Sequence, residues 1–258
     1  MNSTATERIH RLWDELADFG AGRPAQAVIH LLTVLCELAG AWNATWAGAV
    51  RFEAGGHDDP LQGWRVGAVQ ALHAIPPHPE EGHFKEILRV WDKRDIDPSF
   101  LLPLRDVGAF RTYSFRRELP AAWFESDFYQ RHYGTAGTSD AVFVAFPLNE
   151  DCESHFGFYA RDRFTDEAII LLAEALRGIK WFHRGLMLSQ GLLLASAPLT
   201  AAERRVLLLL LTGTPEKEIA QQLGLAVSTV HQYVAAIYRK FAVRSRAALM
   251  GIWLNQQQ

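Results

Sequence analysis

Apolar positions near the start of the chain follow the spacing of a helix. Residues 24–40 begin with proline, end with glycine and carry apolar side chains three or four positions apart: Val28, Leu31, Leu32, Leu35 and Leu38. This spacing predicts an amphipathic helix over 24–40, preceded by another over 3–20.

The pattern then changes to one typical of strands. Residues 44–52 and 64–72 suit two β-strands separated by the turn-rich segment 55–60. A helix is expected over 79–95. The segment 96–133 contains short apolar runs, prolines and many aromatic residues, which predict mixed helix and loop.

A second strand pair is expected at 141–148 and 154–160, with 149–153 as its turn. Thr165 then caps a long helix, whose first turn holds acidic residues that the helix dipole favours. Glycines at 178, 185 and 191 are placed to bend or break this helix.

This order of elements predicts an α+β front domain, an antiparallel sheet with flanking helices, over residues 1–188. Residues 189–198 are expected to be a linker, and 199–258 a four-helix, all-α tail. The front domain resembles, in architecture only, small sensory domains of the GAF or PAS kind. It lacks the alternating strand and helix units of a receiver domain.

The tail begins with a sequence typical of a capping box, Thr200-Ala-Ala-Glu203. Its first helix ends at Gly213, Thr214-Pro215 is expected to start the second with threonine as cap, and Gly224 supplies a tight turn. The apolar residues of the three helices are expected to form the core: Val206, Leu207, Leu210, Leu211, Ile219, Ala220, Leu223, Val230, Val234, Ile237 and Phe241.

The third tail helix then presents the opposite face outward: Ser228, His231, Gln232, Ala235 and Arg239. An amide such as Gln232 can pair with two atoms of an adenine edge. Phosphate contacts are expected from Ser228, Thr229, Arg239 and Lys240, and a contact across the groove from Lys217. An ordinary three-helix bundle with a solvated polar face is the alternative.

The tail resembles the LuxR-type helix-turn-helix family over 199–249. The matching signature is Leu-Thr-x-x-Glu at 199–203, Gly-x-x-x-Lys-Glu-Ile-Ala at 213–220, Thr-Val at 229–230 and Arg-Lys-Phe-x-Val-x-Ser-Arg at 239–246. The resemblance implies that the third helix enters the major groove, that His231, Gln232 and Ala235 read bases, and that a fourth helix, 245–254, pairs two subunits. Ala226 stands where the family usually has serine, so the cap of the third helix is expected to be weakened or moved toward Ser228. Tyr233 stands where the family usually has histidine.

Composition adds an asymmetry of charge. The chain has a net charge of −3, but its last sixty residues contain seven basic and three acidic side chains, so the tail carries +4 and the remainder −7. A basic tail is the distribution expected when only that part approaches a polyanion. Two cysteines, the absence of a long apolar run and a start without a secretion pattern favour a cytoplasmic protein that does not enter a membrane.

The front domain is rich in tryptophan, which either fills a large core or lines a ligand pocket. Trp42, Trp46 and Trp64 are the ligand-binding candidates, although they do not match the Trp/Tyr/Asp signature of relatives that sense acyl-homoserine lactones. Cys152-x-x-His155 lacks a second pair of ligands, so neither a metal site nor a cofactor is predicted.

These features predict a homodimeric regulator of transcription that binds double-stranded DNA, gated by a small molecule or partner at the front domain. Two alternatives remain at this point. One is an enzyme with a catalytic front domain and a helical assembly tail, and the other is an orphan regulator that has no ligand.

Overall fold

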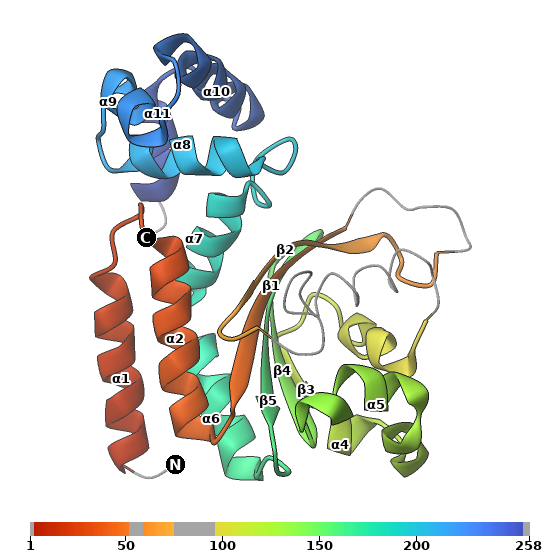
Figure 1. The fold of residues 1–258 in the computed structure, drawn as a ribbon. Helices are drawn as coiled ribbons and strands as arrows, with labels where there is room; N and C mark the ends of the chain where they lie inside the picture. The colour runs from red at the N-terminus through yellow and green to blue at the C-terminus, as the bar shows by residue number, and fades with distance from the viewer. Residues whose placement is uncertain (1–2, 52–58, 75–95, 255–258) are drawn as a thin grey trace. The chain divides into compact units, whose positions relative to one another are not determined.

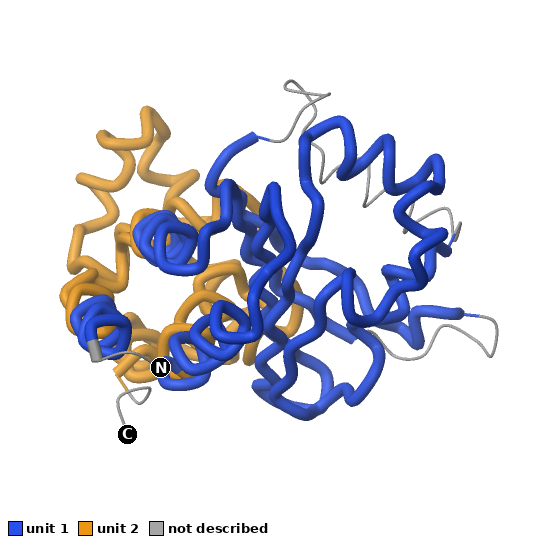
Figure 2. Tube along the Cα trace, turned by 90° about the horizontal axis from the view of Figure 1, so that it is seen from below, with its two compact units in different colours: residues 1–12, 28–179 blue, residues 13–27, 180–258 orange. Residues whose placement is uncertain are grey.

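The computed structural model describes residues 3–51, 59–74 and 96–254. The helix expected over 79–95 and most of the turn expected over 55–60 lie outside these residues. Contacts between Cα atoms divide the chain into two compact units (Figure 2). Unit 1 comprises Met1–Leu12 and Val28–Ile179, and unit 2 comprises Trp13–Ala27 and Lys180–Gln258.

Unit 1 contains a five-stranded antiparallel sheet with helices on both faces (Figure 1). Its strands are β1 (Asn43–Arg51), β2 (Trp64–Ala71), β3 (Arg111–Ser114), β4 (Asp140–Asn149) and β5 (Cys152–Ala160). They are arranged in the order β2-β1-β5-β4-β3. The predicted α+β class and both predicted strand pairs are confirmed.

Strand β3 was not expected, because it lies within the segment predicted to be helix and loop. It has four residues, Arg-Thr-Tyr-Ser, too few to show a period-two pattern. The strand exists because β4 extends beside it and pairs Thr112 with Val144 and Tyr113 with Phe143. The remaining elements of this segment are short: η1 (Pro98–Leu104), α4 (Phe115–Glu118), η2 (Ala121–Glu125), α5 (Asp127–His132) and η3 (Gly134–Ala136).

Alternation of side chains gives the sheet two different faces. Helices α2 (Pro24–Ala39) and α6 (Asp166–Arg177) cover one face, and α4, α5 and the neighbouring loops lie over the other (Figure 1). Trp46 of β1 and Phe156 and Phe158 of β5 point to the same face of the sheet and are fully buried. The residues that alternate with them, including Thr45 and Gly157, lie on the second face and line a cavity there.

The long helix expected after Thr165 is two helices, α6 and α7 (Lys180–Gln190), separated at Gly178. The predicted cap is confirmed, because the Thr165 hydroxyl accepts a hydrogen bond of 3.2 Å from the Ala168 amide. Gly185 lies inside α7 without ending it. Gly191 follows α7 with φ of +70°, and a Cβ there would lie 2.7 Å from the Leu199 side chain, so only glycine fits this turn.

Helix α1 spans Ser3–Ala17, and its residues from Trp13 onward belong to unit 2. Unit 2 also contains the tail helices α8 (Ala201–Leu211), α9 (Glu216–Leu223), α10 (Val227–Lys240) and α11 (Arg246–Leu254). The predicted capping box is present, with Thr200 and Glu203 each bonded to the other's backbone amide. Gly224 has φ of +64° and ends α9 as predicted. The predicted core residues of α8 and α10 are buried.

Two helix starts differ from expectation. Thr214 does not cap α9, since Pro215 occupies the N-cap position, no side chain caps the helix, and the Thr214 hydroxyl lies 3.1 Å from that of Thr212. Helix α10 starts after Ala226 with no side-chain cap, so the predicted weakening is confirmed. The cap has not moved to Ser228, which lies inside the helix.

Candidate ligand cavity and DNA-recognition helix

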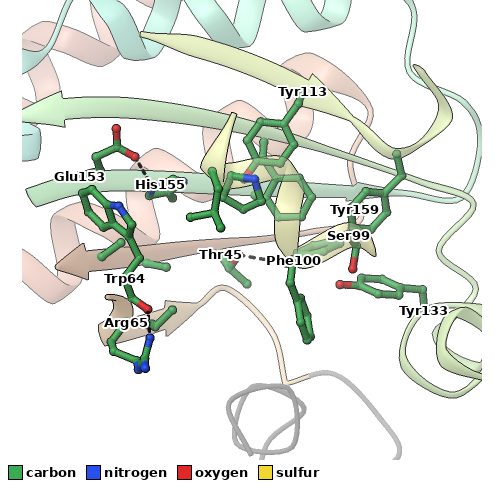
Figure 3. A pocket seen from close by; sticks show the side chains of 18 residues that line it. Thr45, Trp64, Arg65, Ser99, Phe100, Tyr113, Tyr133, Glu153, His155 and Tyr159 are labelled. Carbon is green, nitrogen blue, oxygen red and sulfur yellow. Dashed lines mark hydrogen bonds and ion pairs between the residues drawn. The ribbon is translucent and has the colours of Figure 1, made fainter. Parts of the chain in front are cut away.

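A cavity of about 120 Å³ lies on the second face of the unit 1 sheet (Figure 3). Side chains from β1, β2, η1, β3, α4, β4 and β5 line it, together with Tyr133 between α5 and η3. The lining comprises Thr45, Ala47, Ala49, Trp64, Arg65, Val66, Ser99, Phe100, Pro103, Leu104, Tyr113, Phe115, Tyr133, Phe143, Glu153, His155, Gly157 and Tyr159. The cavity is therefore mainly apolar and aromatic, as small-molecule sites generally are.

Of the three tryptophans proposed as ligand contacts, only Trp64 lines this cavity. Trp46 points to the opposite face of the sheet, where its indole nitrogen donates a 2.9 Å hydrogen bond to the Ser154 hydroxyl. Trp42 packs against the aromatic cluster, with the Arg161 guanidinium 5.3 Å from its ring. Trp46 thus faces away from this cavity, whereas Trp42 is absent from its lining but packs against residues that line it, and its buried indole nitrogen has no hydrogen-bond partner among the described residues.

A buried ion pair forms the floor at one end of the cavity. Arg111 and Glu153 make a two-pronged contact, with nitrogen to oxygen distances of 2.9 and 2.8 Å, and their side chains are only 9% and 2% exposed. The Gly108 amide donates to the same carboxylate at 2.9 Å, and His155 Nε2 lies 3.1 Å from it. Burial alone would raise the pKa of Glu153, but the hydrogen bonds from His155 and Arg111 outweigh it and lower the pKa to about 2.

The second charged side chain of the described lining, Arg65, is also paired within the protein. Its guanidinium lies 3.0 Å from Asp59, whose carboxylate also accepts hydrogen bonds from the Leu61 and Gly63 amides. At the far end of the cavity the Thr45 and Tyr159 hydroxyls lie 3.2 Å apart. Burial raises the pKa of Tyr159 to about 12, so this phenol is neutral. The cavity consequently offers hydroxyl and imidazole groups rather than an uncompensated charge.

Sequence reasoning missed this site, apart from Trp64. One available signal was the run of small residues on alternate positions of β1, at Thr45, Ala47 and Ala49, which leaves room above the strand. Cys152 and His155, considered together for a metal site, lie three residues apart on a strand and face opposite sides of the sheet. Among residues 3–51, 59–74 and 96–254, no group of three or more His, Cys, Asp or Glu could hold a metal ion.

Neither cysteine, Cys36 or Cys152, forms a disulfide, and both are buried. Burial raises the pKa of each thiol to about 12, which keeps both protonated at neutral pH. Neither cysteine is therefore placed to act as a nucleophile. In the described part of the chain, no helix combines the length and the apolar character needed to cross a membrane.

In the tail, α10 keeps one face buried and one exposed. Val230, Val234 and Ile237 are buried, whereas the residues predicted to face outward are exposed: Ser228, His231, Gln232, Ala235 and Arg239. Lys217 in the first turn of α9 is also exposed, and Thr229 is half-buried. The outward face expected from the sequence is therefore exposed, with Gln232 in the second turn of α10.

Lys240 lies differently from the other predicted phosphate contacts. Its ammonium donates hydrogen bonds of 2.7 Å to the Glu203 carboxylate and 2.8 Å to the Pro198 carbonyl oxygen. These bonds connect the end of α10 to the capping box of α8. Burial opposes ionisation of Glu203, but the bonds from Lys240 and Thr200 lower its pKa. Because its side chain is 22% exposed and held by two partners, Lys240 fits a structural role within the tail.

His231 has an internal neighbour as well. Its Nδ1 lies 3.1 Å from the Glu216 carboxylate at the start of α9, and its side chain is 72% exposed. This contact joins the first turn of α9 to α10 at the surface. Gln232, one position later, carries the exposed amide expected to read a base.

Residues 197–252 match the family model described as bacterial regulatory proteins, luxR family. This segment is a luxR-family helix-turn-helix domain, so the chain carries the DNA-binding domain of a bacterial transcription regulator. The family predicted from the tail's motifs is thereby confirmed.

The fold is also similar to several solved structures. The VqsR LBD domain from Pseudomonas aeruginosa is 14% identical, with 72% of this chain and 98% of that chain covered and a TM-score of 0.46. SdiA in complex with octanoyl-rac-glycerol is 12% identical, with 99% and 96% covered and a TM-score of 0.48. Escherichia coli SdiA is 13% identical, with 96% of each chain covered and a TM-score of 0.45. No curated protein matches the chain.

Proposed function

We propose that this regulator binds double-stranded DNA through α9 and α10 and that a small molecule in the unit 1 cavity controls this binding. The chain acts by binding rather than by catalysis. The observation that carries the proposal is the luxR-family match over 197–252, the segment whose third helix presents Gln232 on an exposed face.

Within the DNA-binding surface, two roles are proposed. Gln232 reads a base edge, flanked by His231 and Ala235, because its amide can donate and accept in the major groove. Lys217, Ser228, Thr229 and Arg239 contact phosphates, which position the helix without reading sequence. The net charge of +4 over the tail supports approach to a polyanion.

The proposed assembly is a homodimer that pairs through α11. This helix is apolar over Ala247–Leu254 apart from its glycine, and Leu254 is 66% exposed. A two-fold dimer would present two copies of α10 to successive half-sites of an operator. Sedimentation of the full chain tests the assembly directly.

Control by a small molecule is supported by the cavity, whose aromatic lining and paired charges suit a bound organic molecule. The alternative is an orphan regulator in which unit 1 has no ligand. DNA affinity of the full chain, measured with and without small-molecule extracts, separates the two. An affinity that no extract changes favours the orphan.

Arg239→Ala is expected to weaken binding to all DNA sequences alike and to lower the slope of log K against log salt by about 1, because one phosphate contact is lost. Lys240→Ala is the matched control, since its ammonium is already bonded to Glu203 and Pro198. It should leave the slope unchanged and lower the free energy of unfolding of the tail by about 1–3 kcal/mol, as expected for bonds to a charged group. Fluorescence anisotropy over a salt series measures the slopes, and equal slopes for Arg239→Ala and the parent chain would contradict the assignment.

A further inference from the structure

The size of the unit 1 cavity limits what it can hold. Its volume is about 120 Å³. An engineered apolar cavity of about 150 Å³ is known to bind benzene. The described cavity is therefore of a size that matches a molecule built on a single aromatic ring.

The walls favour a flat ring. Tyr113 and Phe143 are stacked, with centroids 5.1 Å apart and planes at 12°, and Phe115 lies 5.2 Å from Phe143. On the adjacent strands the lining has small residues, including Ala47 on β1 and Gly157, which is paired with Phe143 across β4 and β5. A Cβ on Gly157 would lie 2.8 Å from the Phe143 ring, so the glycine allows that ring to close over the strand. The cavity therefore has these aromatic rings along one side and the small side chains of β1, including Ala47, on another.

The charges around the cavity select against an ion. Arg65 is paired with Asp59, and Glu153 is paired with Arg111. An anionic or cationic ligand would meet no uncompensated partner among the described lining residues, and burying an unpaired charge is costly. The occupant is therefore uncharged.

The polar groups then determine which hydrogen bonds the occupant makes. The Glu153 carboxylate is ionised and can only accept, so the 3.1 Å contact with His155 Nε2 requires that this nitrogen carry the proton. In the neutral ring, Nδ1 is then an acceptor. His155 lines the cavity beside Glu153, at the end opposite Tyr133 and Ser99 (Figure 3). Glu153 is thus a positioning residue that fixes the tautomer of His155.

We propose that the cavity binds an uncharged molecule of single-ring size whose hydroxyl or amine donates a hydrogen bond to His155 Nδ1, with a simple phenol as the minimal example. This inference rests on the proposed control of the protein by a small molecule. The ring lies between Ala47 and Phe143, and the Thr45 and Tyr159 hydroxyls remain for a second polar group at the other end.

The test uses the full chain with phenol, anisole, toluene and benzoate as probes, followed by ligand-observed NMR and titration calorimetry. Phenol can donate to Nδ1, anisole can only accept, toluene can do neither, and benzoate is charged. Phenol is expected to bind at least about tenfold more tightly than anisole, which corresponds to one hydrogen bond. Benzoate is expected not to bind.

Two variants test separately the hydrogen bond to His155 and the volume of the cavity above Ala47. His155→Phe should remove the preference for phenol over anisole while toluene still binds. Ala47→Leu, which leaves Glu153 and His155 in place, should abolish binding of every probe by filling the floor. Thermal unfolding of both variants checks that they are folded. Equal binding of phenol and anisole to the parent chain, a preference that survives His155→Phe, or no binding of any neutral probe would overturn the inference.

A DNA-binding assay on the same preparation shows whether a negative result contradicts only the proposed ligand class or the proposed function as a whole. If the chain binds DNA and responds to an extract but binds no single-ring probe, only the ligand class is wrong. If it retards no DNA under any condition, the proposed function itself fails.

Discussion

Arg111→Met is expected to lower the free energy of unfolding of unit 1 by about 3–5 kcal/mol, because it leaves the Glu153 carboxylate buried without its cation. The Glu153 side chain is only 2% exposed, so water cannot replace the lost guanidinium. The variant also removes the hydrogen bonds that Arg111 donates to the carbonyl oxygens of Ala109 and Pro103. Urea unfolding of the full chain, followed by tryptophan fluorescence, measures the loss.

The pH dependence of stability, compared between the parent chain and Arg111→Met, is the control for this prediction. In the parent chain the pKa of Glu153 is lowered from 4.5 to about 2, so its contribution to stability is present above pH 4.5 and is lost as the pH falls toward 2. Without Arg111 the buried carboxyl group is easier to protonate, so the variant should gain relative to the parent in acid. His155 and the Gly108 amide also face the carboxylate and are unchanged by the substitution. The difference in stability should shrink between pH 7 and pH 3, and a constant difference would argue against a buried ion pair.

Trp46→Ala is expected to cost about 3–5 kcal/mol, because it empties a large volume between the sheet and helices α2 and α6. Trp46 is 1% exposed, and its indole nitrogen is bonded to Ser154 on the neighbouring strand. For a unit of this size the loss corresponds to a decrease in Tm of about 6–20 °C. Differential scanning calorimetry of the full chain measures it.

Trp181→Ala is the matched control, since this tryptophan is 36% exposed. It should cost much less than Trp46→Ala. Similar losses for the two variants would mean that Trp46 does not contribute the packing assigned to it.

The elements that the sequence predicts well are those whose pattern is long and regular. The strand pairs around Trp46 and Phe156 were expected because apolar runs bounded by turn residues indicate strands. The tail core at Val230, Val234 and Ile237 was expected because a period of 3.6 indicates the buried face of a helix. Strand β3 could not be predicted in this way, since four residues show no period and the strand depends on pairing with β4.

The exposed face of α10 and the unit 1 cavity also differ in how far the sequence predicts them. The exposed face of α10 follows from helix geometry alone, so Gln232 could be placed from the sequence. The cavity could not, because it joins side chains from seven separate elements, and their proximity depends on tertiary packing and strand register. Lys240 shows this limit within one helix: its position beside Arg239 suggested a phosphate contact, but packing of α10 on α8 brings it to Glu203.

The central claim is that α10 reads DNA sequence through Gln232. The direct measurement is the affinity of the full chain for a fragment selected from a random DNA pool and for single-base variants of it, compared among the parent chain, Gln232→Ala and Gln222→Ala. Gln222 is an exposed amide on α9 and serves as the matched control. Gln232→Ala alone is expected to lose about 1–3 kcal/mol of discrimination at one base pair. The central claim is contradicted if no fragment is bound, or if Gln232→Ala discriminates between the fragments as well as the parent chain does.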